Sequence, residues 1–313
     1  MRVHGRRLRC AFLLVLAVTL PIRSLAGEAQ NAFNEGVKQY KVGKYPDAIK
    51  LFSRALKAAP KSAEAYNNRG LAYFKLGRNE DAVKDYDEAI KINPKMTDAY
   101  LNRANVHIAV KNYPRAIEDL DDAIKLDPKL VDAYYIRADA QLALKNYQRA
   151  VKDLDEVIIR KPKDARAYRQ RGLAYNGLNQ FDRAVNDFNH AEKLDPKDVE
   201  IYYHRGLAYR RLGKNDLAVE DYTNAIKLEP KNAESYNNRA NAYSLLGKFD
   251  RAVKDYDEAI KLDSKNGKIY ANRGVIRRRL GRYDEAKMDF IRALELDPGL
   301  KPQLEPFLTH GKR

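Results

Sequence analysis

The sequence predicts an all-α solenoid built from eight helix–turn–helix units in tandem. Three observations support this prediction: prolines recur every 34 residues, one alanine recurs in every period, and apolar residues within each period keep helical spacing. A fixed period of this length is typical of stacked small units, each of which buries its apolar face only against its neighbours. The prolines are Pro60, Pro94, Pro128, Pro162, Pro196, Pro230 and Pro298, and Ser264 fills the missing place.

The composition suits long amphipathic helices. Of the 313 residues, 44% are hydrophobic and 33% are charged, and there is no tryptophan. A mean hydropathy of −0.66 excludes an integral bundle of membrane helices. The net charge of +16 could attract nucleic acid. However, acidic and basic residues are interleaved along the predicted helices, so we interpret the charge as a solvated surface and expect no nucleic-acid partner.

The first 26 residues have the three parts of a secretory signal peptide. Residues 1–9 are basic, residues 10–22 are apolar, and small residues surround Ala26, after which we expect cleavage. The apolar run is shorter than the roughly 20 residues of a membrane span. An uncleaved anchor remains the alternative. Since Cys10 is the only cysteine, the mature chain would contain no disulfide. We therefore expect an exported bacterial protein that is periplasmic or secreted.

The repeated unit is clearest in residues 63–96. Numbered from its first residue, this unit has a tyrosine at position 4, glycine at 8, alanine at 20 and tyrosine at 24. Position 20 is alanine in all eight units and position 8 is glycine or alanine, so two helices can approach closely there. Apolar residues at 21, 24 and 28 give the second helix its buried stripe. The expected units are 29–62, 63–96, 97–130, 131–164, 165–198, 199–232, 233–266 and 267–300.

The turn between the two helices of a unit is also repeated. Position 15 suits a residue in the left-handed conformation, which glycine adopts without strain. Five units have glycine there: Gly43, Gly77, Gly213, Gly247 and Gly281. In the other three units we assign this role to Asn112, Asn146 and Asn179, because asparagine is the next best residue. The proline at position 32 ends the second helix.

Two parts of the sequence depart from the regular repeat. At the fourth-to-fifth junction, Val157, Arg160 and Glu192 replace small or apolar residues, so we expect a looser joint there. Residues 301–313 form a short capping segment. In it, Pro302 would begin a helix that turns Leu304, Phe307 and Leu308 onto the last unit.

The pattern resembles the tetratricopeptide repeat (TPR), which has an aromatic at position 4, small residues at 8, 20 and 27, an aromatic at 24 and proline at 32. The resemblance covers residues 29–300. It implies a right-handed superhelix whose first helices line a concave groove, with positions 2, 5, 6, 9, 12 and 13 facing that groove. It also implies a protein or peptide partner and no cofactor or metal.

One pairing is internal to this sequence. Position 7 is arginine and position 23 is aspartate in the same seven units, and the first unit lacks both. We predict an Arg–Asp bridge between the two helices of each unit, for example Arg69–Asp85, Arg103–Asp119 and Arg239–Asp255. The alternative is an arginine ladder that binds an anion, but a paired arginine is already engaged.

Position 6 is the strongest candidate for recognition. It is asparagine in five units, and an amide offers both a donor and an acceptor, so a column of amides could hold the backbone of an extended peptide. The column resembles the asparagine ladder of the TPR domain in O-GlcNAc transferases. The alternative is a solvated face. The predicted groove residues are Asn68, Asn102, Gln170, His204, Asn238, Asn272, Asn105, Asn241, Arg169, Arg210 and Arg278.

The predicted groove has uneven charge. Acidic residues such as Asp132 and Asp139 lie in the earlier units and basic residues such as Arg166 and Arg210 in the later ones. This arrangement would direct an acidic segment of a partner towards the C-terminal units. The two-carboxylate clamp of chaperone-binding TPRs is matched only in part, by Asn237, Asn241 and Asn272, and we do not predict it.

The sequence contains no catalytic constellation. The histidines are isolated, and there is no glycine-rich phosphate loop, metal-spaced histidine pair or nucleophile–base pair. We therefore predict a non-enzymatic scaffold that binds an extended peptide or protein segment in its groove, in envelope assembly or secretion. The alternatives are a self-assembling structural protein and a regulatory subunit of a separate enzyme.

Overall fold

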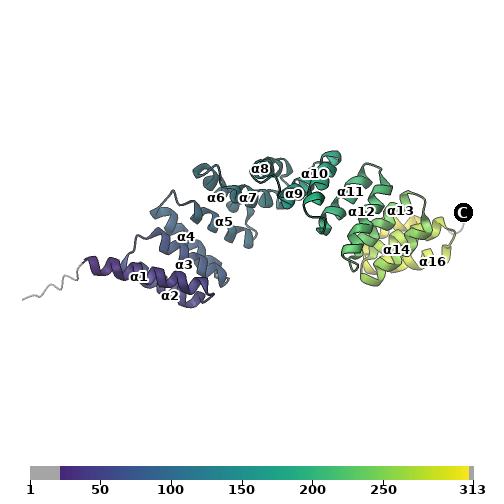
Figure 1. Cartoon of the computed structure of the whole chain (residues 1–313). Helices are drawn as coiled ribbons and strands as arrows, with labels where there is room; N and C mark the ends of the chain where they lie inside the picture. The colour runs from purple at the N-terminus through teal and green to yellow at the C-terminus, as the bar shows by residue number, and fades with distance from the viewer. Residues whose placement is uncertain (1–21, 310–313) are drawn as a thin grey trace, which may run out of the picture. The chain divides into compact units, whose positions relative to one another are not determined.

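The computed structural model describes residues 22–309, which form seventeen α-helices and one 3₁₀ turn and contain no strand (Figure 1). Within each compact body described below, the helices follow one another in antiparallel pairs joined by short turns, so the all-α repeat architecture predicted from the sequence is confirmed. The described chain falls into two compact bodies, one ending at Lys111 and the other beginning at Asn112. This boundary lies in the turn inside the third unit.

The first body contains five helices: α1 Ile22–Lys41, α2 Tyr45–Ala58, α3 Ala63–Lys75, α4 Asn79–Ile92 and α5 Thr97–Ala109. The second body begins with α6 Tyr113–Leu126, α7 Val131–Ala143, α8 Tyr147–Arg160, α9 Ala165–Gly177, α10 Phe181–Leu194 and α11 Val199–Arg211. It continues with α12 Asn215–Leu228, α13 Ala233–Leu245, α14 Phe249–Leu262, α15 Gly267–Arg279, α16 Tyr283–Leu296, η1 Pro298–Leu300 and α17 Lys301–Thr309.

Several of the first helices begin after a capping side chain, whereas α5 and α7 follow Met96 and Leu130, which provide no cap. Ser62, Asp164 and Asn232 accept hydrogen bonds from the exposed backbone N–H groups of α3, α9 and α13. Helix α1 differs, because it begins at Ile22, seven residues before the expected Ala29. Ala29 follows Glu28 instead of such a capping residue. Helix α1 therefore extends further toward the N-terminus and includes residues 22–28.

Close helix contact occurs where position 8 meets position 24. A methyl group added to Gly172 would lie 2.8 Å from the ring of Phe188, and one added to Gly70 would lie 2.8 Å from the ring of Tyr86. Both rings are fully buried. Glycine at position 8 therefore makes room for an aromatic ring. In the fourth unit, position 8 is Ala138 and the smaller Leu154 of α8 occupies position 24, where it is also fully buried. The seventh unit combines Ala240 with the buried ring of Tyr256.

The turns correct one part of the sequence analysis. The five expected glycines have positive φ, between 71° and 79°, and so has Asn179 at 58°. In the two remaining turns the left-handed residue is Lys111 (58°) or Lys145 (60°), so the assignment to Asn112 and Asn146 is wrong. The asparagines follow one residue later, in front of α6 and α8, where the Asn112 side chain accepts from Arg115 N.

The core continues across the fourth-to-fifth junction, where the sequence suggested a looser joint. Val157 is fully buried in a cluster that includes Ala167 of α9. At the C-terminal end, Leu304 of α17 is buried beside Phe290, and the rings of Phe290 and Phe307 stack with centroids 5.4 Å apart. Helix α17 begins at Lys301, one repeat after the first residue of α15, and lies where the first helix of a further unit would lie.

Candidate peptide-binding groove

Buried Arg–Asp pairs hold the two helices of a unit together. Nε and Nη2 of Arg69 donate to the two carboxylate oxygens of Asp85, both at 2.7 Å. The same fork occurs at Arg137, Arg171, Arg205, Arg239 and Arg273 with the aspartate sixteen residues later. The pair Arg103–Asp119 would span the two bodies and stays a prediction.

Each of these arginines makes a second contact that we did not predict. Nη1 reaches the side chain sixteen residues earlier, at position 25 of the preceding unit. Arg137 Nη1 lies 2.5 Å from Asp121, Arg171 Nη1 2.6 Å from Asp155 and Arg239 Nη1 3.1 Å from Thr223. Asp87 on α4 lies 2.5 Å from Arg103 Nη1. Position 7 therefore joins successive units. Because these guanidinium groups are engaged within the chain, they are not available to bind an anion as the arginine-ladder alternative requires.

The carboxylates of these pairs are deeply buried. Burial raises the pKa of Asp85, Asp153 and Asp221, and hydrogen bonds from the facing arginine oppose that rise. The side chain of Asp221 is only 4% exposed. Loss of the arginine would therefore leave a charge without water or a partner.

The predicted column of asparagines uses its amide donors within the chain. Asn102 Nδ2 donates to Asn67 Oδ1 at 2.9 Å, and Asn272 Nδ2 donates to Asn237 Oδ1 at 3.4 Å. In both pairs, position 6 contacts position 5 of the preceding unit. Two further amides are engaged: Asn238 Nδ2 donates to Tyr203 Oη at 3.1 Å, and Asn68 Nδ2 donates to the backbone oxygen of Glu64 at 2.8 Å. The carbonyl oxygens of the four side chains remain as acceptors, and all four residues are half-buried.

Gln170 lies in a different environment from these asparagines. It is buried, and its Nε2 donates to Asp139 of α7. Arg166 Nη2 lies 2.8 Å from the other oxygen of the same carboxylate. Burial raises the pKa of Asp139, whereas Arg166 and the bond from Gln170 lower it. These contacts tie α7 to α9.

The remaining predicted residues have varied surroundings. His204 Nε2 lies 3.0 Å from Glu200 Oε2, and Arg169 Nε lies 2.8 Å from Asp198 Oδ2. Arg278 donates to the backbone oxygen of Phe307 in α17 at 2.9 Å. Asn105 is half-buried on α5.

The predicted separation of charge is weaker than the sequence suggests. Asp132 lies 3.2 Å from Lys161, and Asp139 is paired with Arg166 as described above. Since these acidic and basic residues neutralise each other locally, the fourth unit contributes little net negative charge.

Arg210 and Asn241 form a separate cluster with two tyrosines. Tyr256 Oη donates to Asn241 Oδ1 at 2.7 Å. Burial raises the pKa of Tyr222 and Tyr256, and the charge of Arg210 is the largest opposing effect on both. Arg210 therefore lies close to both phenols, on a first helix and at a groove-facing position of the repeat.

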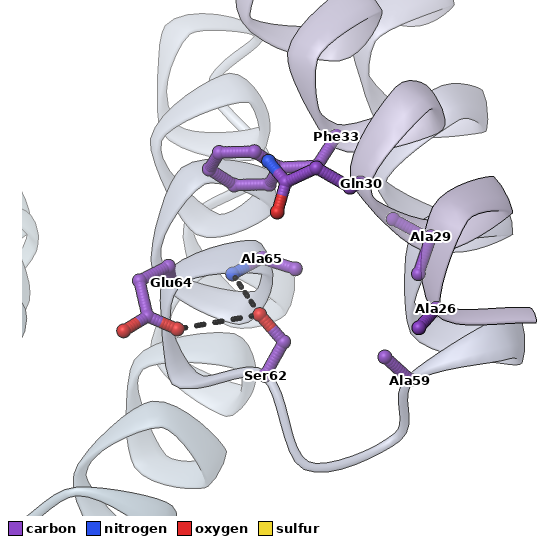
Figure 2. Close-up of a pocket in the computed structure, with 9 residues that line it drawn as sticks. Ala26, Ala29, Gln30, Phe33, Ala59, Ser62, Glu64 and Ala65 are labelled. Carbon is purple, nitrogen blue, oxygen red and sulfur yellow. Dashed lines mark hydrogen bonds between the residues drawn. The ribbon is translucent and has the colours of Figure 1, made fainter. Parts of the chain in front are cut away.

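A small cavity in the first body was not predicted. Its volume is about 280 Å³, and Figure 2 shows Ala26, Ala29, Gln30 and Phe33 of α1 facing Ala59 and the start of α3 across it. Ser62 and Glu64 supply polar atoms at one side. Ala26 belongs to the additional N-terminal part of α1, so the cavity depends on a helix extension that the repeat pattern does not show.

The described residues contain no group of three or more His, Cys, Asp or Glu side chains that could hold a metal ion. Among residues 22–309, no helix combines the length and the apolar character needed to cross a membrane. Residues 1–21, which include most of the expected signal peptide, lie outside the described part of the chain.

Tandem helix pairs with small residues at the helix crossings define a helical-repeat protein. Sequence profiles described as tetratricopeptide repeat or TPR repeat match residues 33–97, 101–165, 172–213, 206–247, 233–266 and 267–300. The chain belongs to the tetratricopeptide repeat family. A search of curated protein sequences found no match.

Solved structures show the same fold. YrrB, a TPR protein with an unusual peptide-binding site, is 21% identical, with a TM-score of 0.55 over 59% of this chain and 95% of YrrB. The C-terminal part of a TPR protein from Cytophaga hutchinsonii is 19% identical, with a TM-score of 0.65 over 77% and 98% of the two chains. MamA from Desulfovibrio magneticus is 27% identical, with a TM-score of 0.52 over 54% and 95%. The repeats make this protein a scaffold for protein–protein interaction.

Proposed function

We propose that the first helices bind an extended peptide segment of a partner protein. The supporting observation is the set of amide side chains at position 6. In Asn68, Asn102, Asn238 and Asn272 the Nδ2 groups are engaged within the chain, and the Oδ1 atoms remain as fixed acceptors. An extended peptide presents backbone N–H groups, which such acceptors recognise without regard to side chains. Because their amides are already held, the asparagines lose little conformational freedom on binding.

The test uses peptides selected by the full chain from a random display library. Asn68 and Asn102 lie in the first body and Asn238 and Asn272 in the second, so each pair is replaced by alanine separately. Loss of two hydrogen bonds should weaken the affinity for a peptide bound at that body about 10-fold. Replacement of the exposed Asn186 on α10 by alanine is the matched control. If both pair variants bind the selected peptides as tightly as the control does, the proposal is wrong.

We also propose that the chain acts outside the cytoplasm, in envelope assembly or secretion, with residues 1–26 as a cleaved signal. Cleavage after Ala26 would shorten α1 to a helix that begins at Gly27 and would remove one wall residue of the cavity. Mass spectrometry of the N-terminus after expression with an export reporter tests this proposal. Recovery of the full-length chain from the cytoplasmic fraction would contradict it.

Self-association is the second candidate. Met288 and Ile291 of α16 are 72% and 44% exposed, at positions where the other units have polar residues. Replacing both by the lysine and aspartate found in α14 should abolish any concentration-dependent increase in mass seen by light scattering. A wild-type chain that is monomeric across the concentration series would exclude this candidate.

A further inference from the structure

Arg210 is exceptional among the half-buried arginines of the described chain. The others form an ion pair with a carboxylate or, in the case of Arg278, donate to a backbone oxygen. Within residues 22–309, Arg210 forms no ion pair, and its Nε is enclosed without a hydrogen-bond partner. A guanidinium group that has lost part of its hydration without gaining a counter-ion is destabilised.

The two tyrosines beside Arg210 are neutral, because burial raises the pKa of both phenols. Asn241 uses its Oδ1 to accept from Tyr256, which leaves its Nδ2 without a partner in the described part of the chain. The hydroxyl of Tyr222 is enclosed and has no hydrogen-bond acceptor there. The cluster therefore offers a ligand one positive charge and one amide donor, because both tyrosine side chains are fully buried.

We propose that Arg210 and Asn241 form a subsite for a single carboxylate, supplied by an aspartate or glutamate of a bound peptide. The planar guanidinium group matches the two oxygens of a carboxylate, and the amide of Asn241 provides one more donor. One positive charge suits a carboxylate better than a phosphate, which carries nearly two negative charges and is usually held by several basic groups. The inference rests on the proposed peptide-binding function and specifies one residue of the peptide.

The first experiment needs no selected peptide. Arginine and asparagine side-chain NMR signals of the full chain are followed during titration with N-acetylaspartate amide, N-acetylasparagine amide or sodium phosphate at constant ionic strength. The Arg210 and Asn241 signals are assigned by their loss in Arg210→Gln and Asn241→Ala. Both should shift saturably with the aspartate derivative and stay unchanged with its neutral counterpart. Equal shifts with both derivatives, no shift with either, or a larger response to phosphate would overturn the subsite.

The second experiment uses peptides selected by the wild-type chain. We expect an acidic residue at one fixed place, and its change to the amide should weaken binding about 10- to 100-fold. The same change in the peptide should not alter its affinity for the Arg210→Gln variant. It should weaken binding to Arg211→Gln by the full factor, because the exposed side chain of Arg211 lies over the Phe181 ring, outside the proposed subsite. An unchanged acid preference in Arg210→Gln would refute the subsite. If no peptide is selected at all, the proposed function fails, and the titration still decides whether the carboxylate site exists.

Discussion

Arg205 and Asp221 form an ion pair in which both residues are buried, with Arg205 Nε and Nη2 donating to the two carboxylate oxygens at 2.9 and 2.7 Å. The third nitrogen of Arg205 donates to Asn189 of the preceding unit at 2.7 Å. One side chain thus connects α10, α11 and α12. A buried bridge of this kind stabilises little relative to an apolar pair, but its disruption is costly because one charge remains without a partner.

Replacing Arg205 by leucine should destabilise α11 and α12 by about 3–5 kcal/mol, since Asp221 would stay buried and unpaired. Hydrogen exchange of the amides in these two helices measures the loss locally, which is preferable because repeat arrays depart from two-state unfolding. Removing the exposed Lys261–Glu258 pair through Lys261→Ala should change stability far less, because solvent screens that pair. If the two variants exchanged at equal rates, the buried pair would have no special role.

Gly172 and Phe188 should behave as a coupled pair. Gly172→Ala adds a methyl group 2.8 Å from the ring of Phe188. Overpacking costs about 1–3 kcal/mol, and the gain in helix propensity of about 1 kcal/mol offsets only part of it. Adding Phe188→Leu reproduces the combination found at Ala138 and Leu154. The double variant should therefore lose about 1 kcal/mol less unfolding free energy than the two single variants lose together. Additive effects in denaturant unfolding would contradict this prediction.

Lys145 should be replaceable with a gain in stability. A residue other than glycine with φ of 60° is strained by about 1 kcal/mol. Lys145→Gly should therefore stabilise the α7–α8 turn by ~0.5 kcal/mol, after allowance for the greater freedom of glycine in the unfolded chain. Gly213→Ala, at the equivalent position of the α11–α12 turn, should have the opposite sign. Thermal unfolding of the two variants provides the measurement, and the same sign in both would disprove the conformational explanation.

Asp139 should make stability depend on pH in an unusual direction. Burial raises its pKa in the folded state, so the folded chain binds a proton more readily than the unfolded chain. The resulting contribution to stability is fully present below the unfolded pKa, about 3.9, and is lost as the pH rises through the folded pKa. Asp139→Asn removes the titrating group and keeps an acceptor for Gln170. The variant should gain stability over the wild type at neutral pH, and the difference should shrink on acidification.

The fold could be predicted because its determinants recur within the chain. Ala82 and the alanines equivalent to it mark every helix crossing, and each one repeats the same geometric requirement. The left-handed turn residues Lys111 and Lys145 occupy position 15, so the repeat register points to them, but residue preference favoured the neighbouring asparagines. In these two turns the spacing of the helices, rather than residue preference, determines which residue has positive φ.

The site was harder to predict because its contacts join neighbouring units. In the first seven units, position 25 holds serine, aspartate, asparagine or threonine, so it looks variable, although all four residue types accept a hydrogen bond from the arginine sixteen residues later. What these residues share is a side-chain oxygen that accepts a hydrogen bond, and this common property distinguishes position 25 although the residue type varies. The engagement of Asn102 with Asn67, and the lack of a counter-ion at Arg210, depend on packing that no pattern in one unit specifies.

The arginine at position 7 has a consequence for how arrays of this kind can change length. Each internal junction consists of an arginine from one unit and an acceptor from the unit before it, so gain or loss of 34 residues by recombination between internal units regenerates a complete junction. The outer copies are not interchangeable with the internal ones. An internal copy of the first unit would place Glu35 where the arginine belongs, and an internal copy of the eighth would set Ile291 against the next guanidinium group. The junction residues therefore determine which units can stand at the two ends of the array, and they leave the internal units interchangeable.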